Sequence, residues 1–207
     1  MQIYTGLPFT AEDADKIIGL GMGVMLTPGH GFSKQTLRAL KNGPAALDNG
    51  AFSAWQKGCG FDELPFLQCI SRFIKEKIPL KIVAVPDIVA GGMDSYWFSE
   101  HWKLRLSGHK NLYLVVQDGM PFDVDLTGYA GVFVGGSVEW KWTTAASWVC
   151  VAHSAGKRCH IGQVGTIERL LRAHNFGVDS VDGTNYQRNK AWRHVEEFNE
   201  RVRGIMT

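Results

Sequence analysis

The sequence lacks most features of secreted, membrane-spanning or metal-dependent proteins. Its 207 residues include only four cysteines, and no two of them form a CxxC pair. A structural zinc site needs closely spaced ligands, so the spacing predicts buried, reduced thiols instead. No apolar run approaches the ~20 residues of a membrane span, and the first ten residues resemble no secretory signal. We therefore expect a soluble, cytoplasmic protein (in the host cytoplasm if it is viral) with no membrane partner.

An excess of charge of one sign is also missing. The 22 Lys and Arg residues against 20 Asp and Glu residues give a net charge of +2, which does not indicate a protein that coats nucleic acid non-specifically. A near-neutral net charge does not exclude a local basic face. The seven histidines show no HxH or HExxH spacing, so we expect neither a metal nor any other cofactor.

Short apolar runs alternate with helical patterns along the whole chain. Runs rich in Val, Ile and Leu are typical of strands that are buried on both faces of a parallel sheet. We expect helices over 33–42, 62–77 and 166–177 and at the C-terminus, and no helix over 119–130. The expected strands are 3–6, 23–28, 45–50, 81–87, 111–118, 131–136, 158–164 and 179–184.

About eight β/α units without a linker, repeat or low-complexity segment predict one α/β domain over residues 1–207. A doubly wound sheet and a closed (β/α)8 TIM barrel both fit this alternation. Eight strands followed by a C-terminal helix favour the barrel, which typically has about 250 residues. We therefore expect a trimmed (β/α)8 barrel.

Polar residues follow the expected strands at the same end. They are Asp48-Asn49-Gly50, Asp87, Gln117-Asp118-Gly119, Gly135-Gly136, Gly162-Gln163 and Asp182-Gly183. Each motif alone is ordinary turn chemistry, but the C-terminal strand ends of such a barrel line its active site. Paired carboxylates suit glycosidic-bond chemistry. The Gln and Asp side chains and the backbone N–H groups of the Gly-Gly turn suit hydrogen bonding to the edge of a heterocyclic base.

Five segments, in order, resemble motifs of the tRNA-guanine transglycosylase superfamily. They are "LDNGAFSAW" (47–55), "VVQDGM" (115–120), "VFVGGSVE" (132–139), "HIGQVGTIERLL" (160–171) and "GVDSVDGTN" (177–185). The resemblance covers residues 45–190. Within this superfamily, the short chain most resembles the viral DNA 7-deazaguanine transglycosylases (the DpdA type). These enzymes exchange guanine in DNA for a 7-deazaguanine.

The resemblance implies a role for each matching position. Asp182 would be the nucleophile at C1′, and Asp48 the general acid and base. The base would be held by Asp87, Gln117, Gly135, Gly136 and Phe52, with Gly162 and Gln163 forming one pocket wall. Arg188, Lys190, Lys141 and Arg193 would hold the nucleic-acid backbone. Asp179 matches the first aspartate of its motif and is expected to be structural.

The chain departs from the family in lacking the zinc ligands and the zinc-binding subdomain of the tRNA enzymes. This favours DNA over tRNA as partner, with a free preQ0-like 7-deazaguanine as second substrate. Alternatives are a tRNA-guanine transglycosylase, a catalytically silent base-binding or partner subunit, and another barrel enzyme such as a glycoside hydrolase. The sequence leaves open the inserted base, the sequence context, a homodimer, and the role of Asp118.

Overall fold

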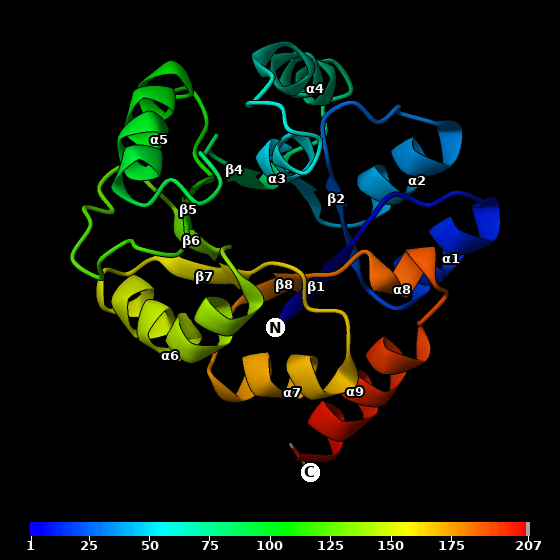
Figure 1. The fold of residues 1–207 in the computed structure, drawn as a ribbon. Coiled ribbons are helices and arrows are strands. Elements are labelled where there is room, and N and C mark those ends of the chain that lie inside the picture. The colour runs from blue at the N-terminus through cyan, green and yellow to red at the C-terminus, as the bar shows by residue number, and fades with distance from the viewer. Residues whose placement is uncertain (206–207) are drawn as a thin grey trace.

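Eight parallel strands close into a barrel, which confirms the expected fold (Figure 1). The computed structural model describes residues 1–205. The strands pair in sequence order, and β1 pairs with β8 to complete the ring. Their bounds are β1 Gln2–Thr5, β2 Gly23–Leu26, β3 Ala45–Leu47, β4 Leu80–Ala84, β5 Leu112–Val116, β6 Gly131–Val134, β7 Arg158–Ile161 and β8 Ser180–Asp182.

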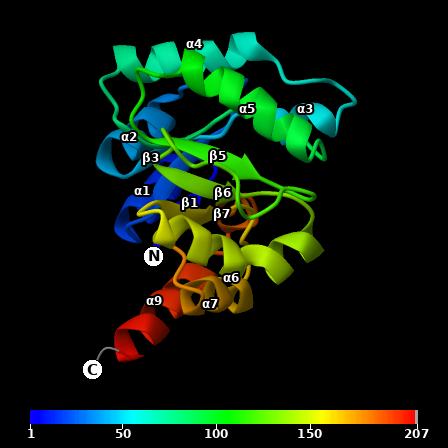
Figure 2. The same cartoon turned by 90° about the vertical axis from the view of Figure 1, so that its left-hand side faces the viewer.

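Helices surround the strands on the outside (Figures 1 and 2). They are α1 Ala11–Gly19, α2 Lys34–Asn42, α3 Ala51–Trp55, α4 Glu63–Lys75, α5 Met93–Arg105, α6 Val138–Ser154, α7 Ile167–Asn175, α8 Asn185–Arg188 and α9 Arg193–Ile205. Ser33 and Thr166 are the N-caps of α2 and α7, and their side chains accept hydrogen bonds from backbone N–H groups of the first turn. No helix separates β5 from β6, as expected for 119–130.

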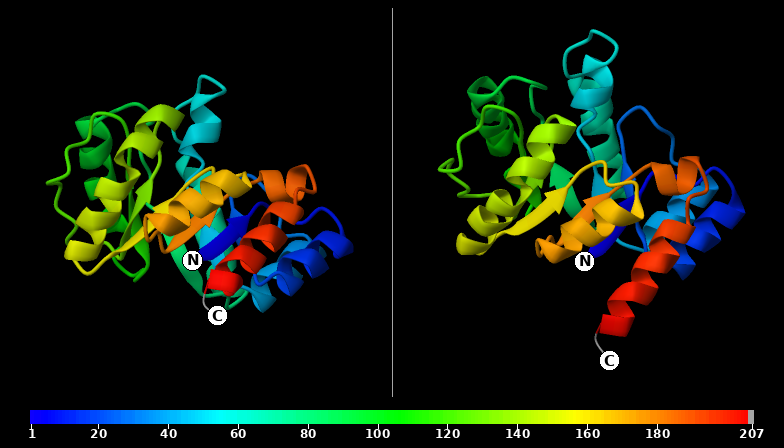
Figure 3. Two further views of the ribbon diagram at one scale, coloured as in Figure 1. Left: turned by 90° about the horizontal axis from the view of Figure 1, so that it is seen from below. Right: turned by 60° about the horizontal axis from the view of Figure 1, so that its bottom comes forward.

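The last helix completes the outer ring. α9 lies between α7 and α1 (Figures 1 and 3), where Glu196 pairs with Lys16 of α1 at 3.1 Å. The ring of helices thus closes where the ring of strands closes. This arrangement leaves the C-terminal ends of the strands free for a site.

The strands are shorter than expected at their C-terminal ends. The expected strands 45–50, 81–87 and 111–118 end at Leu47, Ala84 and Val116. Their polar residues follow the strands as loops, in which Asn49 and Gln117 donate side-chain hydrogen bonds to Asp87. This moves the candidate residues out of the sheet and onto the barrel rim.

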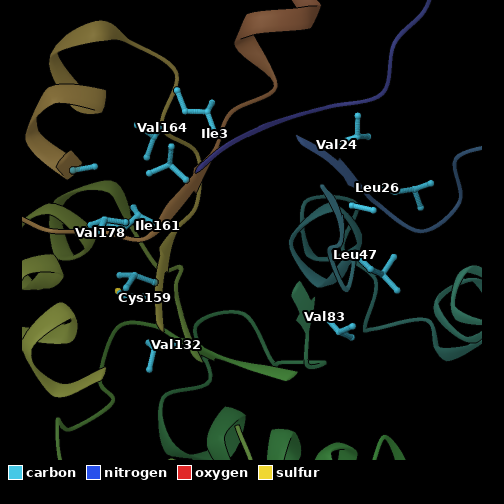
Figure 4. Packing of buried hydrophobic residues seen from close by; sticks show 14 of the residues in the cluster. Ile3, Val24, Leu26, Leu47, Val83, Val132, Cys159, Ile161, Val164 and Val178 are labelled. Carbon is cyan, nitrogen blue, oxygen red and sulfur yellow. The ribbon is translucent and has the colours of Figure 1, made fainter. Parts of the chain in front are cut away.

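Two separate apolar layers hold the barrel together. The larger layer packs strands against helices and includes Ile3, Val24, Leu47, Val132 and Ile161 (Figure 4). The smaller layer fills the barrel interior. It contains Tyr4, Met25, Ala46, Ile82, Ala84, Tyr113, Val115 and Phe133. Strand residues therefore alternate between the two layers, as side chains on a strand point to opposite faces.

Two glycines make room for the interior tyrosines. Gly23 is the register partner of Tyr4, and Gly131 is the register partner of Tyr113. A Cβ at Gly23 or Gly131 would lie 2.4 Å or 2.3 Å from the neighbouring tyrosine ring. The interior is filled by pairing a large residue on one strand with a glycine on the next.

The expectation of four buried thiols is half wrong. Cys69 and Cys159 are buried, but Cys59 and Cys150 are exposed, and all four are free. Cys59 lies in the loop after α3, and Cys150 lies on the solvent side of α6. Among the helices that the structure describes, none combines the length and apolar character needed to cross a membrane.

Replacing Gly131 by alanine should destabilise the protein by about 1–3 kcal/mol, because the added methyl group overpacks the barrel interior against Tyr113. Urea unfolding followed by circular dichroism measures this free energy of unfolding. Gly19→Ala is the matched control, because nothing lies within 4 Å of a Cβ built there. An equal effect of both substitutions would contradict the packing argument.

Candidate active site at the barrel mouth

The polar strand-end residues converge on one cavity at the mouth of the barrel. The cavity has a volume of about 760 Å³. It is lined by Asp48, Asp87, Gln117, Gly135, Gly136, Phe52, Gly162, Gln163, Asp182, Lys141 and Arg188, among others. A second hollow of about 440 Å³ near the start of β4 has no carboxylate in its lining. The mouth is therefore the candidate site.

Asp182, the last residue of β8, is held by a buried histidine. His160 Nε2 lies 3.1 Å from Asp182 Oδ1, and His160 Nδ1 lies 2.9 Å from Ser180 Oγ. Because a carboxylate can only accept, the proton is on Nε2, and Ser180 donates to Nδ1. His160 is completely buried, with its ring 4.4 Å from that of Phe133. The Asp182 carboxylate is thus fixed from below.

Asp48 occupies different surroundings on the other side of the mouth. Burial, and after it the nearby negative charge of Asp182, raise the pKa of Asp48 to about 6. Hydrogen bonds from Gly50, Thr27 and Asn49 oppose this shift only in part. Asp48 can therefore carry a proton near neutral pH, which suits a general acid and base.

Lys141, which was expected to hold the nucleic-acid backbone, is buried in the cavity wall. It lies on α6, is only 2% exposed, and donates from Nζ to the Gly162 carbonyl oxygen at 2.9 Å. Burial lowers the pKa of Lys141 to about 8, while the charges of Asp182 and Asp118 oppose the shift. Its ammonium group therefore lies near the carboxylates of Asp182 and Asp118.

Asp87 and Gln117 form a buried polar network. Asp87 accepts hydrogen bonds from Asn49 Nδ2 at 2.7 Å and from Gln117 Nε2 at 3.0 Å. Burial raises the pKa of Asp87 to about 7, and the charge of Asp48 adds to the shift. Gln117 also donates to the Ile88 carbonyl and accepts from Ala90 N. Its side chain therefore ties the loop after β4 to the end of β5.

Asp118 shapes the Gly135-Gly136 turn. Its carboxylate accepts from Ser137 N and from Ser137 Oγ, both at 2.7 Å. Burial alone would raise the pKa of Asp118, but the bonds from Ser137 outweigh it and hold the pKa below its usual value. Gly136 has a φ of 73°, and a Cβ there would lie 2.5 Å from Asp118 Oδ2. Asp118 is thus a structural neighbour of the site.

The wall at β7 is built from Gly162 and Gln163. A Cβ at Gly162 would lie 2.8 Å from the Phe133 ring and 3.4 Å from Asp182 Oδ1, so a glycine allows β7 to approach the nucleophile candidate. Gln163 is exposed in the cavity lining and has a φ of 60°. A left-handed backbone at a residue other than glycine costs energy and is enriched at functional sites.

The predicted basic residues are not brought together. Of the four, only Lys141 and Arg188 line the cavity. Lys190 lies outside it and pairs with Asp13 of α1. Arg193 begins α9, is exposed, and also lies outside the cavity. Asp179 lies at the other end of β8, where its carboxylate bonds to His153 and to Cys159 N, as its structural assignment predicts.

Sequence reasoning missed two residues of the site. His160 was grouped with the other histidines, although an alternating pattern on β7 and β8 places it on the same inward face as Ser180 and Asp182. Trp55 stacks on Phe52 with ring centroids 5.8 Å apart, and both line the cavity. Its spacing of three residues from Phe52 on a helix was a usable signal.

The described residues hold no group of three or more side chains that could bind a metal ion. The arrangement instead offers one carboxylate fixed by His160 and a second with a raised pKa. Two titratable groups whose surroundings separate them in this way can divide the roles of nucleophile and acid. The chemistry that the mouth supports is displacement at a carbon that bears a leaving group.

Asp48→Asn should stabilise the protein at pH 8 by about 1–3 kcal/mol. The folded-state pKa is raised from 3.8 to about 6, so ionising Asp48 costs stability. This loss of stability is absent at a pH below the pKa of Asp48 in the unfolded chain, and it is complete at a pH above its pKa in the folded protein. Urea unfolding at about pH 4.5 should therefore show a gain that is smaller by roughly 2 kcal/mol.

The matched control for this prediction is Asp123→Asn. Asp123 is exposed in the loop after β5, and its replacement should change stability by less than about 0.5 kcal/mol. An Asp48→Asn variant that is no more stable than the wild type at pH 8 would contradict the pKa assignment.

Comparisons with known proteins assign no family to this chain. No protein-family model matches it, and no curated protein matches it significantly. The functional argument therefore depends on the cavity and its residues, and the resemblance to the transglycosylases stays a prediction.

Proposed function

We propose that the protein is a base-exchange glycosyltransferase that replaces guanine in DNA by a preQ0-like 7-deazaguanine. The observation that carries the proposal is the pair of carboxylates at the barrel mouth. Asp182 is fixed by His160, and Asp48 has a pKa of about 6. The resemblance of residues 45–190 to the guanine transglycosylases supplies the substrate class.

In the first step the Asp182 carboxylate attacks C1′ of the nucleotide. The C1′–N9 bond breaks, its electron pair goes to N9, and Asp48 donates a proton to the leaving guanine. This yields a covalent glycosyl-aspartate and an ionised Asp48. The hydrogen bond from His160 Nε2 holds the Asp182 carboxylate in place for the attack.

In the second step Asp48 accepts the N9 proton of the incoming 7-deazaguanine. N9 attacks C1′ from the side that guanine left, and the bond from C1′ to Asp182 breaks. Two inversions give net retention at C1′. A single residue thus acts as acid and then as base, which requires a pKa near the working pH.

The base would lie between the ends of β4, β5 and β6. Asp87, with a pKa of about 7, can present a hydroxyl or a carboxylate to the base edge. The Gly135-Gly136 backbone can offer polar groups without a side chain in the way. Gln117 is engaged within the protein at both ends of its amide, so it acts on the base chiefly by holding Asp87 and the 88–90 loop.

Asp182→Asn should abolish the covalent adduct and leave binding of free guanine within about threefold of the wild type. The amide keeps the shape of the side chain and an oxygen that can accept from His160, but it is no nucleophile. Mass spectrometry of the protein trapped with a guanine-containing oligonucleotide detects the adduct, and calorimetry measures base binding. An adduct that persists in this variant would assign the nucleophile to another residue.

DNA from cells that express the protein with a supply of preQ0 should contain a 7-deazaguanine nucleoside. Mass analysis of digested DNA and tRNA, side by side, identifies the polymer. The matched control is the Asp182→Asn variant expressed at the same level. Modification of tRNA alone would favour the tRNA enzyme, and unmodified DNA and tRNA with soluble protein would favour the silent-subunit alternative.

A further inference from the structure

Two stacked aromatic rings are exposed at the rim of the cavity. Phe52 is 41% exposed and Trp55 is 53% exposed. Their planes are inclined by 27°, with centroids 5.8 Å apart. In a stacked pair one face of each ring covers the other, so each ring keeps its second face for another partner. Large exposed aromatics that line a cavity mark binding sites.

The backbone fixes this pair relative to Asp48. Gly50 starts α3 with a φ of 83°, and Asn49 Oδ1 accepts a hydrogen bond from Ala51 N at 2.8 Å. Asn49 Nδ2 in turn donates to Asp87. Phe52 and Trp55 are three residues apart on the helix and therefore share one face. α3 lies at the mouth end of the barrel, towards which the strands run (Figure 2).

A cation lines the cavity on another element. Arg188 belongs to α8, which follows β8, and is exposed in the cavity lining. Unlike Lys190, which pairs with Asp13, Arg188 has no carboxylate partner among the described residues. Asp48 directly follows β3, which leads into α3, and Asp182 is the last residue of β8, which leads into α8. The cavity thus joins an aromatic pair, two carboxylates and a free guanidinium.

The size of the cavity exceeds what one base needs. Its volume of about 760 Å³ lies in the upper part of the range of about 300–1,000 Å³ for sites that hold whole small molecules. The aromatic pair, Gln56 and Arg188 line it in addition to the carboxylates. These residues offer ring faces and a positive charge, the two features that bind single-stranded nucleic acid.

We propose that Trp55 stacks on the base next to the exchanged nucleotide in a single-stranded or extruded segment, while Arg188 contacts a phosphate of the same strand. The inference rests on the proposed function for the identity of the exchanged nucleotide. Phe52 then lies between Trp55 and the exchanged base, with its one free face available to that base. Stacking accepts any base, so this subsite binds the strand without selecting the neighbouring base.

Trp55→Ala should weaken binding of a short single-stranded deoxyoligonucleotide with one guanine by on the order of tenfold. Fluorescence anisotropy of a labelled strand measures this, in an Asp182→Asn background so that no covalent step contributes. Trp55→Phe should retain most of the affinity. Arg188→Ala should weaken binding and lower the slope of affinity against salt by about one.

Trp97→Ala is the matched control. Trp97 is 63% exposed on α5 and lies outside the cavity lining, so its loss should change strand affinity by less than about twofold. Free guanine carries no neighbouring base, and its binding should be equally insensitive to Trp55→Ala. Circular dichroism shows that each variant is folded.

An equal loss in the Trp55→Ala and Trp97→Ala variants would overturn the proposal. So would a Trp55→Ala variant that binds strand and free guanine equally poorly, because Trp55 would then belong to the pocket of the exchanged base. Strand binding that depends on Trp55 in a protein that exchanges no base would sink the proposed reaction and leave the subsite in place. If the protein exchanges bases but the Trp55→Ala variant keeps the strand affinity of the wild type, the subsite is overturned and the proposed reaction stands.

Discussion

The pairing of β1 with β8 is the constraint on which the rest of the structure depends. Tyr4 is the register partner of Asp182, and Gly183 N donates to the Tyr4 carbonyl at 3.1 Å. A Cβ at Gly183 would lie 2.4 Å from the Val164 carbonyl oxygen, so only glycine allows the chain to pass here. Closure turns eight strand ends into one rim, and Asp48 and Asp182, far apart in sequence, come to share a cavity.

The mouth gains its chemistry at the cost of stability. Burial raises the pKa of both Asp48 and Asp87 and lowers that of Lys141, so the fold disfavours the charged form of each group relative to the unfolded chain. A core of apolar residues below, with Tyr4 and Phe133 against His160, supplies the rigidity that holds these groups in place. Functional sites commonly oppose the stability of their fold in this way.

Local pattern was sufficient to predict the barrel and most of the rim. Short apolar runs identify buried strands, and the residues that follow them must lie on the rim once the strands are parallel. Side-chain direction was beyond that reasoning. Lys141 was expected to hold the nucleic-acid backbone, whereas α6 packs so that Nζ reaches the Gly162 carbonyl. His160 acquires its role only through the register of β7 with β8.

The left-handed Gly50 has a consequence for how the site distinguishes a polymer from a monomer. Asp48, Gly50, Phe52 and Trp55 belong to one short stretch without a flexible linker between them. If a neighbouring base stacks on Trp55, it orders the same stretch that presents the acid. A free nucleoside has no such neighbour and adds no contact to this stretch. Selection for nucleic acid would then act through the order of the catalytic acid, without any contact to the reacting sugar.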